Sequence, residues 1–216
     1  MEAKLVAYTE DPERVCAAAA RSTRSREVIK PGDLKIEGAR RTIKGVMKRG
    51  HTSVLEHASF TFSIEDISRA CSHQLVRHRI ASYSQQSQRY TKAKGYIFPH
   101  SIADKSGASE IYRRGMEHAW EAYEELVEMG IEEEDARYVL PSGASTSLIM
   151  TINARSLLNF FRLRLCFRSQ WEIRELAELM LREVRRVAPS IFEDAGPPCI
   201  EGYCPDGYED CPLYPG

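Results

Sequence analysis

The chain has 216 residues, of which 43% are hydrophobic and 28% charged, and its formal net charge is −1. These values are ordinary for a globular protein that is long enough to bury a substantial core. No apolar run approaches the roughly 18 residues that a membrane-spanning helix needs, and we expect neither a membrane protein nor a secretory signal. Six cysteines are too few for a disulfide scaffold, so we expect a cytoplasmic protein with reduced thiols.

The first elements of the chain are predicted from short local signals. Lys4–Thr9 alternates weakly between apolar and polar residues, which predicts a short strand. Asp11 followed by Pro12 is typical of a capped helix N-terminus. The next helix is expected to start at Gly32–Leu34 and to continue to about Lys48.

The following region is predicted as a strand, a helix and a loop. Ser59–Ile64 alternates and is β-branched or aromatic, which favours a strand. Asp66 is expected to cap a helix that runs to about Arg79. Ala81–Tyr90 is polar and rich in Ser and Gln, and we expect a loop there.

The second half of the chain is mostly helical by its pattern. Helices are predicted over Ser109–Met129, Glu132–Leu140, Ala154–Arg164 and Gln170–Val187, with a strand over Ser145–Ile152. The sequence contains no internal repeat and no linker. The pattern therefore predicts a single α+β domain over residues 1–198, with a small antiparallel sheet packed by several helices. Residues 199–216, rich in Cys, Pro and Gly, are expected to form a tail with little regular structure.

Charge is distributed unevenly along the chain. Ile67–Ala103 and Ala136–Trp171 contain no Asp or Glu, yet together they hold eleven basic residues, nine of them Arg. These are Arg69, Arg77, Arg79, Arg89, Lys92, Lys94, Arg137, Arg155, Arg162, Arg164 and Arg168. Since Arg is suited to planar, bidentate capture of phosphate, the pattern predicts a site for a multiply charged anion.

The densest segment of potential ligand-binding residues is Arg77–Arg89. Gln74, Arg77 and His78 would share one face of the predicted helix. The segment supplies many hydrogen-bond donors and no carboxylate, which suits a phosphate and a neutral hydrogen-bonding base. The alternative is a solvated basic helix end. The sequence has neither a G-x-G-x-x-G fingerprint nor a P-loop, so a nucleotide would have to be bound by a different arrangement of side chains.

This segment resembles the signature of the flavin-dependent thymidylate synthases. The pattern R-H-R-x-x-S-x-x-x-x-S-x-R is met by Arg77, His78, Arg79, Ser82, Ser87 and Arg89. Gly50–His57 is similar to the G-H-x-S/T-x-x-E-H segment of that family. Asn153–Leu157 and Ser169–Glu172 resemble its C-terminal half, and Arg137 also fits.

The resemblance implies a specific reaction and assembly. Family members transfer a one-carbon unit from 5,10-methylenetetrahydrofolate to dUMP and reduce it to a methyl group. FAD is the bound cofactor and NADPH reduces it, so the products are dTMP and tetrahydrofolate. The family fold is α+β, and it forms a homotetramer whose active sites are built from several subunits.

The resemblance also implies roles for individual residues. Arg164 would lie by the uracil edge and stabilise negative charge, and His51 would lie over the flavin and assist the reductive step or folate placement. The dUMP-binding residues would be Gln74, Arg77, Gln85, Gln86, Ser87, Gln88, Arg89, Arg137 and Arg164. The FAD-binding residues would be Thr23, Ser53, Glu56, Arg77, His78, Arg79, Gln85, Asn153, Arg155 and Asn159.

The predicted helix over residues 154–164 has polar groups on two sides. Arg155, Asn159 and Arg162 recur at helical spacing on one face, and Arg164 points away from them. Leu158, Phe161 and Leu165 would form the apolar stripe. Such a helix is typical of one wedged between ligands or subunits; the alternative is a surface helix with an arginine-rich face.

The tail contains three cysteines in the spacing Cys199-x4-Cys204-x6-Cys211, and Cys166 is the candidate for a fourth metal ligand. A structural zinc site is one interpretation, although x6 is wider than the usual ligand spacing. Free or oxidised cysteines in an irregular tail are the other interpretation. In neither case would the tail take part in the chemistry.

A different class of function is a nucleic-acid-binding module that uses the two acid-free stretches as a basic groove. Such a module favours Lys, exposed aromatic residues and a net positive charge. The net charge of −1 and the Arg, Gln and Ser composition of the motif argue against it. We therefore expect small-molecule partners, namely the nucleotide, the folate and the nicotinamide, and neither nucleic acid nor membrane.

Overall fold

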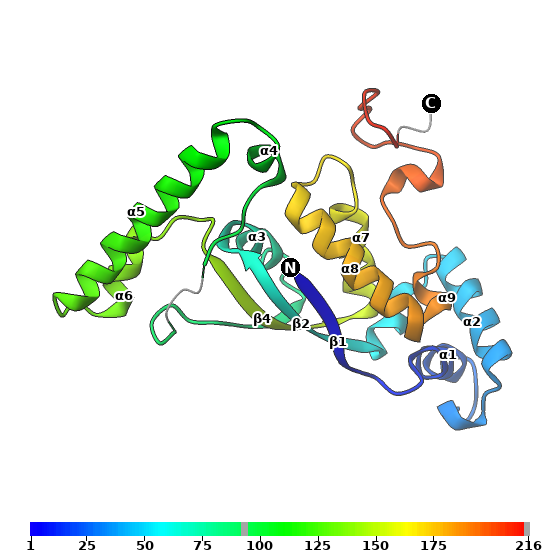
Figure 1. Ribbon diagram of the computed structural model, residues 1–216. Coiled ribbons are helices and arrows are strands. Elements are labelled where there is room, and N and C mark those ends of the chain that lie inside the picture. Colours follow the sequence, from blue (N-terminus) through cyan, green and yellow to red (C-terminus); the bar gives the residue numbers. More distant parts are fainter. Residues whose placement is uncertain (92–94, 214–216) are drawn as a thin grey trace. The chain divides into compact units, whose positions relative to one another are not determined.

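The computed structural model describes residues 1–91 and 95–213, so that Lys92, Lys94 and the last three residues of the tail lie outside the described residues (Figure 1). The fold is α+β, as predicted. Unit 1 comprises Glu65–Arg77 and Ser84–Leu148, together with Met1. Unit 2 comprises Glu2–Ile64, His78–Tyr83 and the described residues from Ile149 onward. The two compact units are described separately below.

The sheet has four strands in the antiparallel order β1-β2-β4-β3. The strands are β1 (Glu2–Tyr8), β2 (Ser59–Ser68), β3 (Ala81–Gln85) and β4 (Ser145–Asn153). The boundary between the units falls within β2, β3 and β4. In the part of β2 that belongs to unit 2, Phe60, Phe62 and Ile64 are fully buried at every second position. This period of two is the reason that the segment forms a strand with one face in the core.

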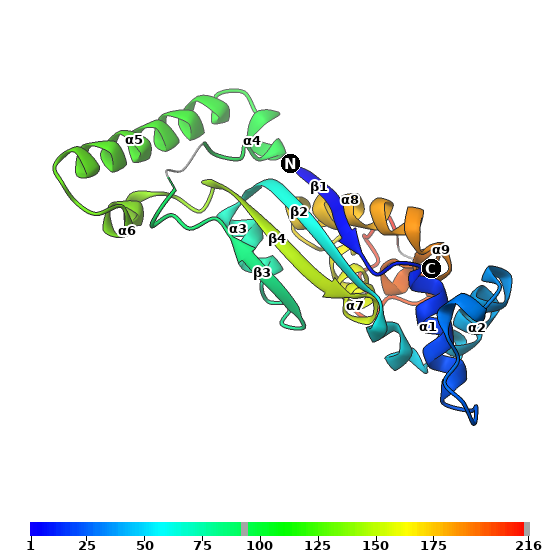
Figure 2. The ribbon, with the colours of Figure 1, turned by 90° about the horizontal axis from the view of Figure 1, so that it is seen from below.

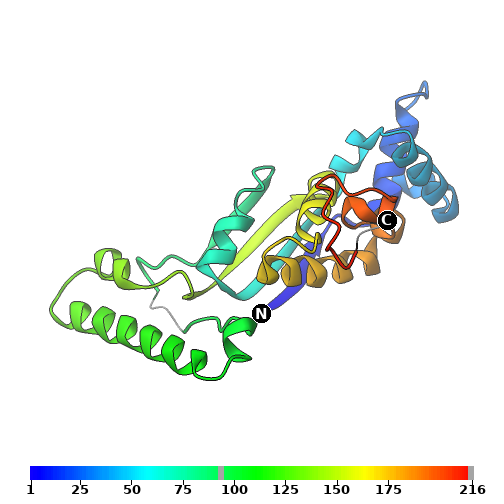
Figure 3. The ribbon, with the colours of Figure 1, turned by 90° about the horizontal axis from the view of Figure 1, so that it is seen from above.

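Unit 2 holds most of the helices. They are α1 (Pro12–Ser22), α2 (Ile36–Lys48), α7 (Ala154–Arg164), α8 (Trp171–Val187) and α9 (Pro189–Phe192). In Figures 1 and 3, α1 packs against α2, and α8 packs against both α7 and β1. Phe192 of α9 meets Phe60 and Phe161 edge-to-face, with ring centroids 5.4 Å and 5.9 Å apart. Buried aromatic rings in this geometry join α9 and α7 to the sheet.

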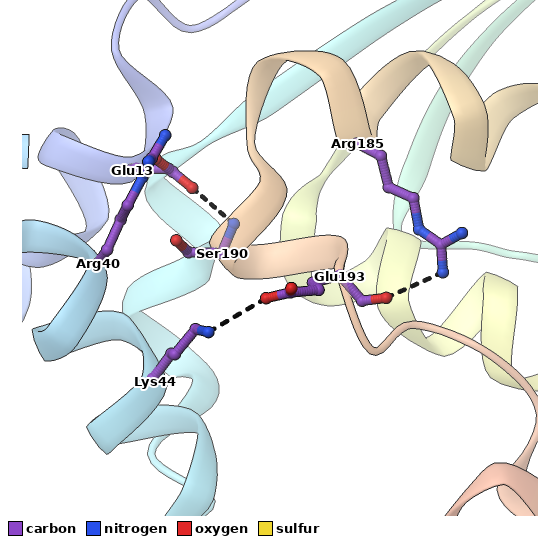
Figure 4. Close-up of polar contacts among 6 residues, drawn as sticks. All are labelled: Glu13, Arg40, Lys44, Arg185, Ser190 and Glu193. Carbon is purple, nitrogen blue, oxygen red and sulfur yellow. Dashed lines mark hydrogen bonds and ion pairs between the residues drawn. The ribbon is translucent and has the colours of Figure 1, made fainter. Parts of the chain in front are cut away.

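A buried carboxylate ties three helices of unit 2 together (Figure 4). Glu13 on α1 is only 3% exposed. One of its oxygens accepts a hydrogen bond from the backbone N–H of Ser190 at 2.6 Å, and the other accepts from Nε of Arg40 at 2.9 Å. Nearby, Lys44 pairs with Glu193 at 3.1 Å, but both of these side chains are well exposed. Of the two carboxylates, only that of Glu13 is buried, and its two hydrogen-bond partners stabilise its charge in the interior.

Unit 1 contains α3 (Arg69–Leu75), α4 (His100–Ala103), α5 (Ala108–Glu128) and α6 (Glu133–Ala136), and α5 runs beside α6 in Figure 2. Of the 21 residues of α5, Met116 and Tyr123 are buried. Tyr112 on this helix meets the rings of Tyr96 and Phe98, with centroids 5.8 Å and 5.0 Å apart. Among the described residues, no helix has the length and apolar character that crossing a membrane requires.

The predicted helix from Asp66 to Arg79 is wrong at both ends. Strand β2 continues to Ser68, and Asp66 adopts a left-handed backbone conformation with φ of 54°. The hydroxyl of Ser68 accepts the N–H of Cys71 at 2.9 Å and caps α3, which ends at Leu75. Arg77 and His78 therefore follow the helix, and the expected common helix face with Gln74 does not exist.

Three further local predictions need correction. The expected loop over residues 81–90 contains strand β3, because Ala81–Gln85 pairs with β4 at the edge of the sheet. Asp11 has φ of 47° and does not cap α1; its carboxylate instead accepts a hydrogen bond from Arg14 at 2.9 Å. Pro31–Asp33 forms a separate 3-10 turn, and α2 begins at Ile36.

The remaining predictions agree closely with the structure. Helix α7 has the predicted bounds, and α5, α8, β1 and β4 differ from prediction by only one or two residues at either end. The helix predicted over 132–140 divides into α6 and a 3-10 turn at Arg137–Val139. Helices α4 and α9, each four residues long, were not predicted.

Candidate active site

The most specific polar contact in unit 2 joins two residues that are 86 positions apart. Nε of Arg164, near the end of α7, donates a hydrogen bond to Nε2 of His78 at 3.0 Å. The His78 ring also lies edge-on to Phe160, with centroids 4.9 Å apart. Two predicted site residues are thus in direct contact, and the imidazole orients the guanidinium.

The surroundings of His78 keep its imidazole neutral at neutral pH. Burial, and then the positive charge of Arg164, lower the pKa of His78 to about 4. The hydroxyl of Tyr83 donates to the carbonyl oxygen of His78 at 2.9 Å, and burial raises the pKa of Tyr83 to about 12. Because Nε2 accepts the hydrogen bond from Arg164, the ring proton of the neutral form lies on Nδ1.

A first cavity of unit 2, about 410 Å³ in volume, lies between α1, α2 and the segment that follows α2. Three predicted residues line it: Thr23, His51 and Ser53. The same cavity is lined by three arginines, Arg21, Arg24 and Arg49. A cavity of this volume with several guanidinium groups suits a phosphate-bearing ligand.

A second cavity of unit 2, about 510 Å³ in volume, is lined by one face of α7. Arg155, Asn159 and Arg162 all border it, which confirms that they share a face. The predicted apolar stripe is partly wrong. The buried positions of α7 are Ala154, Leu157, Phe160 and Phe161, whereas Leu158 lines the cavity and Leu165 is only half-buried.

Two other predicted FAD residues of unit 2 already have partners. Arg155 pairs with Glu56 at 2.5 Å, and both side chains are about half exposed. The carboxamide oxygen of Asn153 accepts the N–H of Ser156 at 2.9 Å and caps α7. The ion pair holds the guanidinium of Arg155 in place at the edge of the second cavity.

In unit 1, the glutamine segment is fixed by hydrogen bonds within the unit. Nε2 of Gln85 donates to the hydroxyls of Ser72 and Thr146 at 3.0 Å and 3.1 Å. The backbone N–H of Gln86 donates to the carbonyl of Ser147 at 2.9 Å. These contacts set the start of the loop that carries Ser87, Gln88 and Arg89.

Two arginines of unit 1 contact Glu134, one at its carboxylate and one at its backbone carbonyl. Nε of Arg89 pairs with Glu134 at 2.5 Å, and Nε of Arg137 donates to the backbone carbonyl of Glu134 at 2.8 Å. Burial, and then the positive charge of Arg137, lower the pKa of Arg69. Glu134 stands two residues before the second acid-free stretch, so the carboxylate that pairs with Arg89 comes from outside both stretches.

The predicted residues divide between the units by ligand. Of the predicted dUMP residues, all but Arg164 belong to unit 1, and of the predicted FAD residues, all but Arg77 and Gln85 belong to unit 2. Arg77 and Arg79 are exposed, and His51, Ser53 and Thr23 are exposed at the rim of the first cavity. The four candidate metal ligands, Cys166, Cys199, Cys204 and Cys211, line a third cavity in unit 2.

Sequence reasoning did not single out Arg21, Arg24 and Arg49 in the first cavity. The cluster of three arginines within residues 21–26 is a usable signal for two of them. Arg69 was noted only as one member of an acid-free stretch. The charge of Arg137 reaches Arg69 only through the tertiary structure, and no local sequence signal predicts this effect.

Comparison with known proteins identifies the class. Residues 4–190 match the Thy1 family, described as thymidylate synthase complementing protein. The chain is 50% identical to a flavin-dependent thymidylate synthase of Geobacter sulfurreducens, with 98% of this chain and 94% of the relative covered. It is 44% identical to the enzyme of the same name from Clostridium tetani, with 98% and 93% covered. The Saccharolobus solfataricus relative, also a flavin-dependent thymidylate synthase, is 47% identical, with 91% and 77% covered. The chain therefore belongs to the Thy1 family.

Proposed function

We propose that this chain methylates dUMP to dTMP, with 5,10-methylenetetrahydrofolate as carbon donor and NADPH as reductant of a bound FAD, and releases tetrahydrofolate. Near full-length similarity to flavin-dependent thymidylate synthases makes the chain an enzyme of that kind. The observation that carries the residue-level proposal is the contact of Arg164 with a neutral His78. It holds a permanently charged guanidinium in one orientation, which supports the role that the resemblance implies for Arg164.

The residues of unit 2 fit a flavin dinucleotide by their chemistry. FAD carries a pyrophosphate, and the first cavity offers the guanidinium groups of Arg21, Arg24 and Arg49 for it. Thr23 and Ser53 offer hydroxyls, and Arg155 and Asn159 offer further donors at the second cavity. When bound, the flavin supplies the reducing equivalents that convert the transferred one-carbon unit to a methyl group.

Arg164 and His78 would have separate tasks in the reaction. Arg164 cannot give up its proton, so it acts by stabilising negative charge as the pyrimidine is activated. His78, with its pKa near 4, is neutral at the pH of the reaction and cannot serve as a cationic acid. We therefore assign it the positioning of Arg164. His51, exposed at the rim of the first cavity, would assist the reductive step or folate placement.

The substrate phosphate would be bound by unit 1. Arg89 and Arg137 flank Glu134, and Arg77 is exposed. Gln74, Gln85, Gln86, Ser87 and Gln88 would complete the dUMP site with hydrogen bonds from neutral groups. Gln85 is also a proposed FAD contact, with Arg77, His78, Arg79, Glu56 and Asn153. Because dUMP has both a neutral base and a charged phosphate, it suits a segment that contains both amide and guanidinium side chains.

We also propose a homotetramer in which the active sites are shared between subunits. Apolar side chains of unit 1 support self-association, because Tyr90, Ile111 and Tyr138 are 79%, 66% and 81% exposed. We place the reaction in the cytoplasm, consistent with six cysteines of which none forms a disulfide. Sedimentation equilibrium tests the assembly: a monomer with full activity would exclude shared sites.

The proposed function is tested by spectroscopy and product analysis. The purified protein is expected to show a flavin absorption band and to form dTMP only when dUMP, 5,10-methylenetetrahydrofolate and NADPH are all present. Tetrahydrofolate is the expected folate product. A colourless protein that does not take up added FAD, or release of dihydrofolate with each dTMP, would contradict the proposal.

A further inference from the structure

Four cysteines from two distant parts of the chain line one cavity of unit 2. Cys166 follows α7, whereas Cys199, Cys204 and Cys211 belong to the tail. The cavity has a volume of about 30 Å³, which is enough to admit a ligand the size of a water molecule. All four cysteines are unpaired. The structure thus brings four thiols around a space that fits a single small ligand.

Tight turns present these cysteines. The N–H of Gly202 donates to the carbonyl of Cys199 at 3.1 Å, and the N–H of Gly207 donates to the carbonyl of Cys204 at 3.2 Å. Both glycines have positive φ, 86° and 57°, which a residue with a Cβ rarely adopts. The N–H of Leu213 points at the sulfur of Cys211 at 3.4 Å. Backbone donors near a sulfur stabilise its thiolate form.

The rest of the cavity wall is apolar, with one cation beside it. Phe167, Pro198 and Leu213 line the cavity with the thiols. Arg168 also lines it, and its guanidinium pairs with Asp206 at 3.1 Å. An apolar shell limits the access of water, and an adjacent guanidinium suits a site whose ligands are anionic.

We propose that Cys166, Cys199, Cys204 and Cys211 bind one thiophilic divalent cation of the zinc type in a tetrahedral structural site. Each thiol loses its proton to solvent on binding, so four thiolates around one dication leave a net charge of −2. Within the described residues, no three His, Cys or acidic side chains are already arranged to hold a metal. Binding therefore requires the four sulfurs to rotate inward to about 2.3 Å from the ion. The three tail cysteines lie beyond the family match, which ends at residue 190, and none of the four cysteines is among the residues assigned to the proposed reaction.

The decisive measurement is metal analysis of the full-length protein purified without chelator. We expect about one zinc per chain, as four-cysteine structural sites bind it. After removal of zinc, titration with Co²⁺ alone should give the strong thiolate-to-cobalt absorption bands of a tetrahedral sulfur site. This second measurement needs no variant and so does not depend on the folding of one.

The variants locate the site. Cys204→Ser and Cys211→Ser should each lose zinc and the cobalt bands, whereas Cys16→Ala, which alters a buried thiol of α1 outside the cavity, should keep both. Zinc that remains in the Cys204→Ser protein would overturn the proposal. So would a metal-free wild type with all thiols titrating natively, or one in which Cys166 or a tail cysteine is found in a disulfide.

Discussion

The two units differ in the groups that surround their arginines. In unit 2, arginines border cavities: Arg21, Arg24 and Arg49 at the first, and Arg155 and Arg162 at the second. In unit 1, Arg89 and Arg137 both contact Glu134. The described lining of the first cavity contains no carboxylate, whereas Arg155 at the second cavity is paired with Glu56 and Arg89 in unit 1 is paired with Glu134.

The pattern of charges along the sequence therefore does not predict the net charge around a site in the folded chain. Arg89 and Arg155 come from the acid-free stretches, yet each pairs with a carboxylate from outside them, Glu134 and Glu56. The three arginines of the first cavity come from outside those stretches, and its described lining residues include no carboxylate. In the proposed dUMP site, Glu134 would have to be displaced or shared when a phosphate binds Arg89. The predictions below test this contrast, beginning with the largest expected effect.

The largest effect is expected at Arg164. Arg164→Ala should slow dTMP formation by about 10²–10³, the usual cost of losing one electrostatic contact to a developing anion. FAD retention, followed by flavin absorbance, should change little because the first cavity is intact. Arg182→Ala, an exposed arginine on α8, is the matched control and should retain full activity. Turnover of the Arg164 variant within a few-fold of wild type would refute the assigned role.

The next effect concerns the stability of unit 2. Glu13→Ala removes a carboxylate that is 3% exposed and leaves the N–H of Ser190 without its partner. The free energy of unfolding in urea should fall by about 2–3 kcal/mol, the range for a hydrogen bond to a buried charged group. Lys44→Ala removes only an exposed ion pair with Glu193 and should cost less than about 1 kcal/mol. Equal losses would show that burial of Glu13 is not what matters.

A smaller effect should appear as a pH dependence at His78. Its pKa is about 4 in the folded protein and about 6.5 when unfolded, so the unfolded state binds the extra proton first. The contribution of neutral His78 to the free energy of unfolding is fully present above pH 6.5. It falls as the pH drops towards 4 and is constant below that. Two charged or titratable groups hydrogen-bond to it, Arg164 on α7 and Tyr83 on β3.

The size of that loss is about 1–2 kcal/mol once solvent screening of a half-buried group is allowed for. Thermal unfolding at several pH values between 4 and 7 should show the loss in the wild type. His78→Gln, which cannot take up a proton, should show a flatter profile over the same interval. Parallel profiles would assign the acid sensitivity to the carboxylates instead.

Much of the fold was predictable where local signals and tertiary packing agree. The start of α8 is an example, because Gln170 accepts the N–H groups of Glu172 and Ile173 as a cap should. The bounds of α7 were also predicted, since Asn153 caps a strongly periodic segment. In both cases the residues that set the boundary lie within three positions of it.

The failures occurred where distant contacts decide the conformation. β3 is half-exposed and polar, and it is a strand because it pairs with β4 rather than because of its own composition. Asp66 takes a left-handed conformation as β2 continues to Ser68, which no capping rule predicts. For the site, the resemblance supplied the residues, but not the pairing of Arg89 with Glu134. The two residues are 45 positions apart, so no local sequence signal predicts their contact.

The smallest predicted effect tests this pairing directly. If Glu134 competes with a phosphate for Arg89, Glu134→Gln should lower the KM for dUMP by up to about five-fold and leave kcat unchanged, because an exposed ion pair contributes at most about 1 kcal/mol. Asp135→Asn makes the same charge change one residue away, where the side chain is exposed, and should move KM much less. Raising the ionic strength should shrink the difference between the two variants, since both guanidinium and carboxylate are about half exposed to screening ions. An identical KM in the two variants would mean that only the net charge of unit 1 acts on dUMP. A higher KM in Glu134→Gln would mean that the carboxylate orients Arg89 for the phosphate instead of competing for it.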